Sequence, residues 1–260
     1  MNRIVESIYW MFKNNHTLKP YERLSQVYDA GWGDFSIQYV SLINDLLMER
    51  GINRARILDI ACGTGILAFE LAKSGYLVYG VDISPEMIKM ARLKSTGLSN
   101  LTFDIQDMAR LKVSDKYDLV ACTFDSINYI LKGSDLKRML SRIASALRDK
   151  GIFIFDSNTK HLYLNHNDET ERRELNGQSL IQHCIYNQNR NIATTVFSFS
   201  DGSYEIHKQR PYNYKELKPL LNHAGFKILS MFSWFEKIPY STKTPKLFCV
   251  AEKNLDHVSP

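Results

Sequence analysis

Short apolar runs alternate with segments of helical periodicity along the first 157 residues. The expected strands, in chain order, are residues 56–61, 77–82, 101–105, 117–123 and 152–157. The expected helices are residues 34–51, 67–73, 85–94 and 135–148, with Asp34 as N-cap of the first and Gly51 as its stop. Strands that alternate with helices are joined by right-handed crossovers into a parallel sheet. The pattern therefore predicts an α/β fold with a doubly wound, Rossmann-like sheet.

The pattern changes after residue 157. Residues 179–186, 192–200 and 204–210 read as three strands joined by polar turns, as in an antiparallel meander. A helical pattern from Tyr214 ends at Gly225, and two further strands, 227–234 and 246–252, follow with no helix between them. Such strands pair antiparallel. We expect a seven-stranded sheet with an antiparallel last strand, plus a small antiparallel β insertion.

Three parts of the chain follow from these patterns. Residues 1–33 are expected to form an N-terminal helical lid segment, residues 34–157 and 211–254 the Rossmann-like core, and residues 158–210 an inserted β lid. The insertion leaves the carboxyl edge of the sheet, where open α/β sheets bind ligands. We expect it to shape a ligand site, with an oligomer interface as the alternative.

Composition narrows the class of protein. The 260 residues are 44% hydrophobic and 23% charged, as in ordinary globular proteins. The net charge of +5 is scattered, so nucleic acid is not favoured as a partner. The four cysteines lie far apart, which predicts buried free thiols in the cytoplasm and no metal site. Charges interrupt the apolar positions of residues 1–17, so no signal peptide or membrane span is expected.

A glycine turn follows the first expected strand directly. In residues 58–65 (LDIACGTG), Gly63 and Gly65 allow backbone N–H groups to approach a ligand. Asp82, at the end of the second strand, is placed to accept hydrogen bonds from a ribose, because Ser84 is the expected cap of the next helix. With Ala68, the turn also fits the G-x-G-x-x-A fingerprint, so an NAD(P)-dependent oxidoreductase is an alternative.

Several segments together resemble one family. Residues 57–65 (ILDIACGTG) resemble motif I of class I S-adenosylmethionine-dependent methyltransferases, and residues 81–92 (VDISPEMIKMAR) resemble their second acidic strand and following helix. Residues 117–130 (YDLVACTFDSINYI) are similar to their fourth strand. Residues 209–226 (QRPYNYKELKPLLNHAGF) are similar to the closing helix of a branch that includes aminosugar and glycine-type N-methyltransferases.

The resemblance implies S-adenosylmethionine as cofactor. It implies that the glycine turn and Asp59 surround the methionine part, that Asp82 holds the ribose, and that residues 105–108 contact the adenine. Residues 28–36 (YDAGWGDFS) resemble a lid whose aromatic side chains cover the cofactor, with core packing as the alternative. The expected cofactor contacts are Tyr28, Trp32, Asp59, Ala61, Gly63, Gly65, Asp82, Ile83, Met87, Gln106, Asp107, Met108, Thr123 and Phe124.

The expected reaction is methyl transfer to a small-molecule amine nitrogen or hydroxyl oxygen. Such an acceptor must lose a proton, and the candidate general bases are Asp125, Tyr129, His183 and His207, with ordinary packing as the alternative for each histidine. The alternatives to this function are the oxidoreductase, an RNA methyltransferase and a non-catalytic cofactor-binding module. The sequence leaves a monomer and a homodimer both open.

Overall fold

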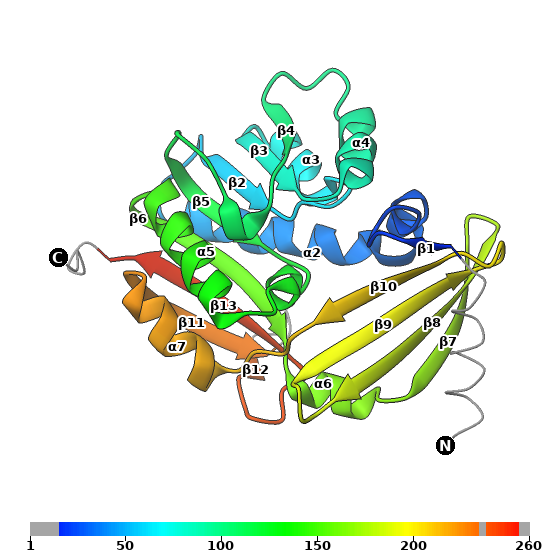
Figure 1. Ribbon diagram of the computed structural model, residues 1–260. Coiled ribbons are helices and arrows are strands. Elements are labelled where there is room, and N and C mark those ends of the chain that lie inside the picture. Colours follow the sequence, from blue (N-terminus) through cyan, green and yellow to red (C-terminus); the bar gives the residue numbers. More distant parts are fainter. Residues whose placement is uncertain (1–15, 234–237, 255–260) are drawn as a thin grey trace.

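The expected strands form an eight-stranded sheet in the computed structural model, which describes residues 16–233 and 238–254 (Figure 1). They are β2 (Arg56–Ile60), β3 (Leu77–Asp82), β4 (Leu101–Ile105), β5 (Tyr117–Cys122), β6 (Leu147–Asn158), β11 (Phe226–Ser233), β12 (Ile238–Pro239) and β13 (Lys246–Lys253). Their order is β12-β11-β13-β6-β5-β2-β3-β4. The seven expected strands are present, and the two-residue β12 is added at one edge.

The chain direction within this sheet follows the sequence pattern. The strands β4, β3, β2, β5 and β6 run parallel, and β13 pairs antiparallel with both β6 and β11. From β2 the chain moves outward to β4 and then returns to β5 on the other side of β2. This reversal of strand order is the place where open α/β sheets bind ligands.

Helices cover both faces of the sheet (Figure 1). The helices α2 (Tyr28–Met48), α3 (Ile66–Lys73) and α4 (Pro85–Lys94) pack on one face, and α5 (Gly133–Ala146) and α7 (Tyr214–His223) pack on the other. In the central strand β6, Ile152 and Ile154 face the first set, and Phe153 and Phe155 face the second. Because successive side chains of a strand point to opposite faces, an uninterrupted apolar run fits a strand that is covered on both sides.

The insertion forms a second sheet. Its strands lie in the order β1 (Thr17–Leu18), β10 (Tyr204–Gln209), β9 (Ile192–Phe199), β8 (Gln178–Asn187) and β7 (Glu169–Leu175). The three expected strands are β8, β9 and β10. The strands β1 and β7 and the short helix α6 (Lys160–Asn165) were not expected. β7 reads ETERREL and is exposed or half-buried throughout, so it lacks the alternation that marks a strand.

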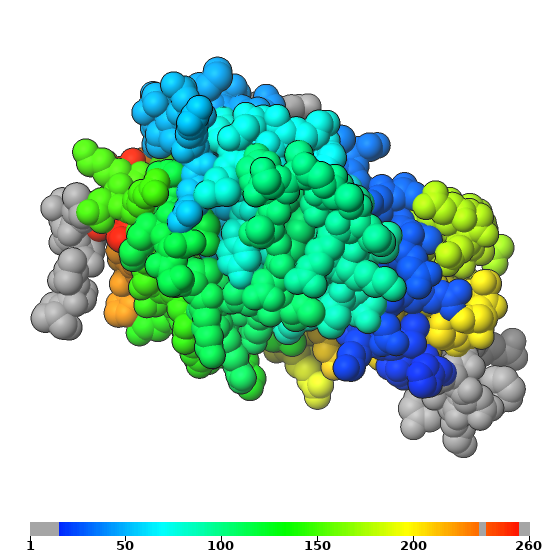
Figure 2. Space-filling model, turned by 90° about the horizontal axis from the view of Figure 1, so that it is seen from above, coloured from blue at the N-terminus to red at the C-terminus, as the bar shows by residue number. Residues whose placement is uncertain are grey.

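The N-terminal segment joins the two sheets. β1 pairs parallel with β10, and the short 3-10 helix η1 (Leu24–Gln26) leads on to α2. Leu24 and Val27 pack against Leu180, Phe197 and Phe199 of the inserted sheet. In Figure 2 this blue segment lies between the cyan and green core and the yellow residues of the insertion.

Some expected boundaries were wrong. α2 begins at Tyr28, six residues before the expected start, so Asp34 lies inside the helix and is not its N-cap. Gly51, with φ +68°, follows the end of that helix, as expected of a stop. α5 ends at Ala146, because β6 begins at the next residue. Nearly all of the pattern at residues 1–17, and Trp234 at the end of an expected strand, lie outside the described residues.

Bilayer crossing by a helix requires about 20 apolar residues in a row. No helix within residues 16–233 and 238–254 combines that length with that apolarity.

Candidate active site

A cavity of about 440 Å³ opens beside the carboxyl ends of the parallel strands, where the strand order reverses. Asp59 enters it from β2, Asp82 from β3 and Thr123 from the end of β5. Twelve of the expected cofactor residues line it, namely Tyr28, Asp59, Ala61, Gly63, Asp82, Ile83, Met87, Gln106, Asp107, Met108, Thr123 and Phe124. The sequence segments that carry the family resemblance therefore meet at one place.

Gly65, also expected at the cofactor, does not line this cavity. It has φ +77°, and a Cβ at this position would lie 2.7 Å from the Phe103 ring and 2.9 Å from the Cβ of Ala91. The residue is glycine because the turn needs a left-handed backbone conformation and packs closely against β4 and α4. The expectation of a direct ligand contact at Gly65 is not supported by this placement.

Asp82 ties the glycine turn to the start of α4. Its Oδ2 accepts a hydrogen bond from Gly63 N at 2.9 Å, and its Oδ1 accepts one from Ser84 N at 2.8 Å. Ser84 Oγ accepts from Met87 N at 3.2 Å, so the cap of α4 is Ser84, as expected. Burial raises the pKa of Asp82, and these backbone hydrogen bonds oppose the rise. Each carboxylate oxygen can accept a further hydrogen bond from a ligand hydroxyl.

Asp59 is a buried polar group of the cavity wall with one unpartnered oxygen among the described residues. Its side chain is 2% exposed, and its Oδ2 has no hydrogen-bond partner among the described residues. Burial, and then the charge of nearby Asp82, raise the pKa of Asp59 to about 8. A buried carboxyl oxygen without a partner is costly, and a cationic group in the cavity would satisfy it.

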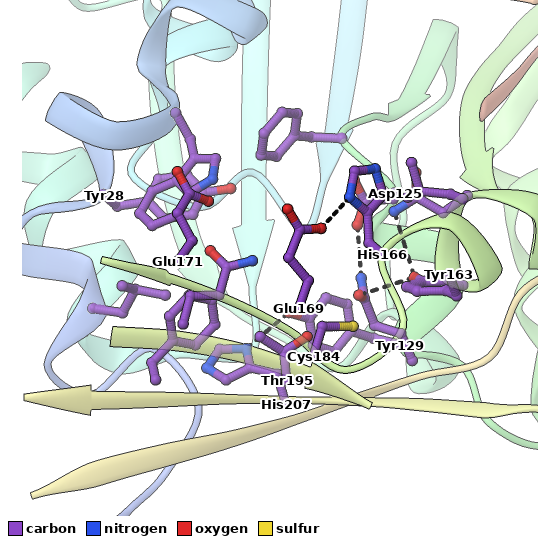
Figure 3. A pocket seen from close by; sticks show the side chains of 18 of the residues that line it. Tyr28, Asp125, Tyr129, Tyr163, His166, Glu169, Glu171, Cys184, Thr195 and His207 are labelled. Carbon is purple, nitrogen blue, oxygen red and sulfur yellow. Dashed lines mark hydrogen bonds and ion pairs between the residues drawn. The ribbon is translucent and has the colours of Figure 1, made fainter. Parts of the chain in front are cut away.

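A second cavity, of about 350 Å³, lies between the inserted sheet and the core. In Figure 3 the side chains of Cys184, Thr195 and His207 extend from strands of the inserted sheet toward it. Four side chains belong to the walls of both cavities: Tyr21, Tyr28, Phe124 and Tyr129. The two cavities therefore adjoin at these four rings, and a molecule in the first would meet a molecule in the second beside them.

Trp32 was expected at the cofactor, but it lines the second cavity alone. Its ring stacks on Tyr28 with centroids 5.4 Å apart, and the guanidinium of Arg173 lies 4.9 Å from the ring centroid. Phe197 meets it edge-on at 6.0 Å. Trp32 thus belongs to the aromatic wall under the insertion.

Three of the four candidate bases, Asp125, Tyr129 and His207, line the second cavity, but His183 lines neither. Gln182 and Cys184 of β8 line the second cavity. His183 lies between them, so its side chain points to the opposite face of the sheet. There His183 Nδ1 shares a hydrogen bond with Thr170 Oγ1 at 2.7 Å. His183 therefore lies on the face of the inserted sheet that is turned away from the cavity.

Both carboxylate oxygens of Asp125 have protein partners. Oδ1 accepts from Lys246 Nζ at 2.8 Å, and Oδ2 accepts from Gln209 Nε2 at 2.7 Å. Lys246 Nζ also lies 3.0 Å from Oδ2 of Asp156, which accepts from Asp125 N. Burial raises the pKa of Asp125, and Lys246 opposes the rise. These contacts fix Asp125 as part of the scaffold and leave it poorly placed to act as a base.

Tyr129 and His207 belong to a chain of hydrogen bonds. Tyr129 Oη lies 2.6 Å from Tyr21 Oη and 2.8 Å from His207 Nδ1, and His207 Nε2 lies 2.9 Å from Glu205 Oε2. Sequence reasoning missed Tyr21 and Glu205. A signal existed for Glu205, because Glu205, His207 and Gln209 alternate along β10 and therefore share one face.

The chain matches known methyltransferases in sequence. The family model of a methyltransferase domain matches residues 57–151. A protein of Geobacillus sp. (strain WCH70) that is named as a methyltransferase is 31% identical over 227 residues, which cover 82% of this chain and 91% of that protein. The glycine/sarcosine N-methyltransferase of Halorhodospira halochloris is 28% identical over 229 residues, covering 85% and 80% of the two chains.

Solved structures share the fold. An S-adenosylmethionine-dependent methyltransferase from Clostridium acetobutylicum superposes with a TM-score of 0.79 at 24% identity, covering 90% of this chain and 99% of that one. The sugar N-methyltransferase KedS8 from Streptoalloteichus gives a TM-score of 0.69 at 19% identity, covering 88% and 92%. The oxidoreductase alternative is not favoured. Tyr214 and Lys218, which have the Y-x-x-x-K spacing of short-chain reductases, line neither cavity.

The first cavity fits this family's cofactor. The partnerless oxygen of Asp59 suits the ammonium of a methionine group, and Asp82 suits ribose hydroxyls. Ile83, Met87 and Met108 add apolar surface for a flat base. With these features and the match over most of its length, the chain belongs to the S-adenosylmethionine-dependent methyltransferases, and S-adenosylmethionine is its methyl donor.

Proposed function

We propose that the protein methylates a small molecule, at an amine nitrogen or a hydroxyl oxygen, that binds in the second cavity. We call this the acceptor cavity and the first one the cofactor cavity. The observation that carries the proposal is the wall of four rings that the two cavities share. Methyl transfer requires the acceptor atom in contact and in line with the methyl group, and two cavities that adjoin at shared, rigid side chains favour that alignment.

Different residues of the chain would bind different parts of the cofactor. The cofactor supplies a methyl group that is already electrophilic, because it is carried on a sulfonium. Asp59 would hold the methionine ammonium, Asp82 the ribose, and Asp107 with its neighbours the adenine. The stacked Tyr28 and Trp32 would exclude water from the region between the cavities.

The acceptor cavity has the size and lining of a small-molecule site. Its volume of about 350 Å³ lies within the usual range for such sites. Its wall combines aromatic rings with pairs of polar side chains, namely Glu169 with His166 and Glu171 with Arg173. This lining supports a polar acceptor, as do relatives named for glycine and sarcosine.

Residues 158–210 would then act as the substrate lid of a core made by residues 34–157 and 211–254. We further propose that the enzyme works in the cytoplasm, as a monomer or homodimer, and without a nucleic-acid partner. Four free cysteines support the cytoplasmic setting, and the scattered positive charge supports the absence of a nucleic-acid partner.

The test uses one cavity-filling variant and a matched control on the same strand. Thr195 lines the acceptor cavity, whereas Thr194 points to the other face of β9. We expect Thr195→Phe to abolish methyl transfer and keep S-adenosylhomocysteine binding, and Thr194→Phe to keep both. The assay measures transfer from methyl-labelled S-adenosylmethionine to glycine, sarcosine, glucosamine and catechol, and to the small-molecule, RNA and protein fractions of a cell extract. Label found in RNA or protein alone, or full activity in Thr195→Phe, would refute the proposal.

A further inference from the structure

The hydrogen-bond chain of Tyr21, Tyr129, His207 and Glu205 joins the N-terminal segment, the loop after β5 and the inserted sheet. Its members are buried or half-buried, and Glu205 is 0% exposed. Tyr129 lies in the wall shared by the cofactor and acceptor cavities, whereas Glu205 lies in neither wall. The hydrogen-bond chain therefore leads from the expected site of reaction to the carboxylate of Glu205, which is buried in the protein.

The direction of each hydrogen bond follows from Glu205. Its carboxylate accepts backbone hydrogen bonds from Tyr21 N at 2.7 Å, Arg23 N at 2.7 Å and Leu24 N at 2.8 Å. A carboxyl group that faces three backbone donors acts as an acceptor, so Glu205 also accepts from His207 Nε2–H.

In a neutral imidazole the second nitrogen is then an acceptor. The Tyr129 hydroxyl donates to His207 Nδ1 and accepts from the Tyr21 hydroxyl. The Tyr129 oxygen keeps one lone pair for a further donor at the junction of the cavities.

We propose that Tyr129 and His207 form a proton relay, held in place by Glu205, that takes up the proton released by the methyl acceptor. The relay rests on the proposed function. As the bond forms between the acceptor atom and the methyl carbon, and the bond from that carbon to sulfur breaks, the acceptor's X–H proton moves to the Tyr129 oxygen. The Tyr129 hydroxyl proton moves at the same time to His207 Nδ1. The products are the methylated acceptor, a neutral thioether, a neutral Tyr129 and an imidazolium paired with Glu205.

A relay through the hydroxyl fits the surroundings of Tyr129 better than a tyrosinate base does. Burial raises the pKa of Tyr129 well above its ordinary value, and Asp125 and Glu205 add to the rise. An isolated phenolate is therefore disfavoured, but a hydroxyl that gains one proton while it passes on another stays neutral throughout. The positive charge that enters on the sulfonium ends on His207, where a carboxylate already lies 2.9 Å away.

The arrangement also selects the class of acceptor. The groups that face His207 are Glu205 on its own strand, Tyr129 from the loop after β5, Tyr21 from the N-terminal segment and the ring of Phe197 from β9. A relay ending there serves an acceptor that carries a hydrogen on its nucleophilic atom, which means a hydroxyl or an uncharged primary or secondary amine. Tyr129 would be the catalytic residue, and Glu205 a positioning residue.

The first test needs no acceptor. Protein labelled with nitrogen-15 histidine and saturated with S-adenosylhomocysteine is observed by NMR near neutral pH, and His207→Gln assigns the signals. We expect His207 to carry its hydrogen on Nε2 and to have an unprotonated Nδ1, whose shift changes in Tyr129→Phe. Tyr204 lies on the opposite face of β10 and serves as the control. Adding Tyr204→Phe to Tyr129→Phe should leave the Nδ1 shift as it is in Tyr129→Phe alone. A hydrogen on Nδ1, or on both nitrogens, would overturn the relay.

The second test measures single-turnover transfer to whichever named compound or small-molecule fraction takes label in the assay above. Tyr129→Phe and His207→Gln should each slow transfer by about 10²-fold or more, and the double variant should be no slower than either one. The acid-side fall of the wild-type pH profile should disappear in His207→Gln, a result that a packing role would not produce. Glu205→Gln should slow transfer less and keep that fall.

Unchanged rates, or losses that multiply in the double variant, would overturn the relay. If no small molecule took label, the proposed function would fail, and the NMR result would still decide whether the hydrogen-bond chain has the direction that a relay requires.

Discussion

Cofactor binding should release a proton from Asp59. Because burial and Asp82 raise the pKa of Asp59 to about 8, its carboxyl is about nine-tenths protonated near pH 7 in the cofactor-free protein. A methionine ammonium beside Oδ2, which has no partner among the described residues, favours the ionised form. Binding should therefore displace close to one proton per site.

The size of the effect follows from the same pKa. Ionising Asp59 near pH 7, about one unit below its pKa, costs about 1.4 kcal/mol of binding free energy. Cofactor affinity should therefore rise close to tenfold from about pH 6 to about pH 7, and level off above about pH 8. The group is 2% exposed, so solvent screening reduces this effect little.

Asp59 makes the free energy of unfolding fall as the pH rises, which is the opposite of the effect of a carboxylate whose folded-state pKa is lowered. The folded-state pKa of Asp59 lies above its unfolded value, so the stability it contributes is fully present at acid pH and is lost as the pH rises toward about 8. The cofactor-free protein should lose free energy of unfolding over that interval. Asp59→Asn should remove this loss.

Titration calorimetry with S-adenosylhomocysteine, in buffers of different ionisation enthalpy, measures the proton directly. The wild type should release close to one proton, and Asp59→Asn should release none and show little change of affinity with pH. Asp107→Asn, in the wall of the same cavity, is the control and should keep the release. Heats that do not depend on the buffer, or proton release that persists in Asp59→Asn, would refute the reasoning.

Three further substitutions test the scaffold around the cofactor. Asp82→Ala should weaken cofactor binding by about 1.5–3 kcal/mol and also lower the melting temperature, because the carboxylate holds two backbone N–H groups; unchanged affinity in calorimetry would contradict this. Gly65→Ala should cost about 1–3 kcal/mol of stability in urea unfolding, because φ is +77° and Phe103 fills the space; a loss of affinity at unchanged stability would argue for a ligand contact instead. Lys246→Met leaves the buried carboxylates of Asp125 and Asp156 without their cation. It should lower the free energy of unfolding by about 3–5 kcal/mol near neutral pH and by less in acid. A cost that is equal at both pH values would refute that account.

Most of the residues expected at the cofactor line one cavity, because their sequence signals are local. The glycine turn, Asp82 and the Ser84 cap lie within or just beyond single β-α units, whose geometry follows from periodicity and turn residues. Asp59 was expected there from the family resemblance of residues 57–65 and not from periodicity. Gly65 does not line the cavity, and its positive φ and close packing demand glycine as strongly as a ligand would.

The acceptor side was harder to predict because it depends on strand parity and on distant contacts. A shift of one residue along β8 separates His183 from the cavity-lining Gln182, and a run of polar residues does not fix which face is inward. The link between Glu205 and the N–H of Tyr21 joins residues 184 positions apart. No spacing rule detects such a pair.

The parallel pairing of β1 with β10 also has a consequence for how the protein is made. Thr17 and Tyr204 are partners in register, 187 positions apart, and a ribosome adds roughly 5–20 residues per second. The N-terminal segment therefore waits roughly 10–40 seconds for the strand that holds it, while the strands β2 to β5 emerge and can already pair. During that interval Leu24 and Val27 lack the inserted sheet that buries them. The nascent chain thus carries an apolar, unpaired stretch at residues 17–27 until β10 has been made, and this stretch is where a chaperone that binds emerging chains would find its target.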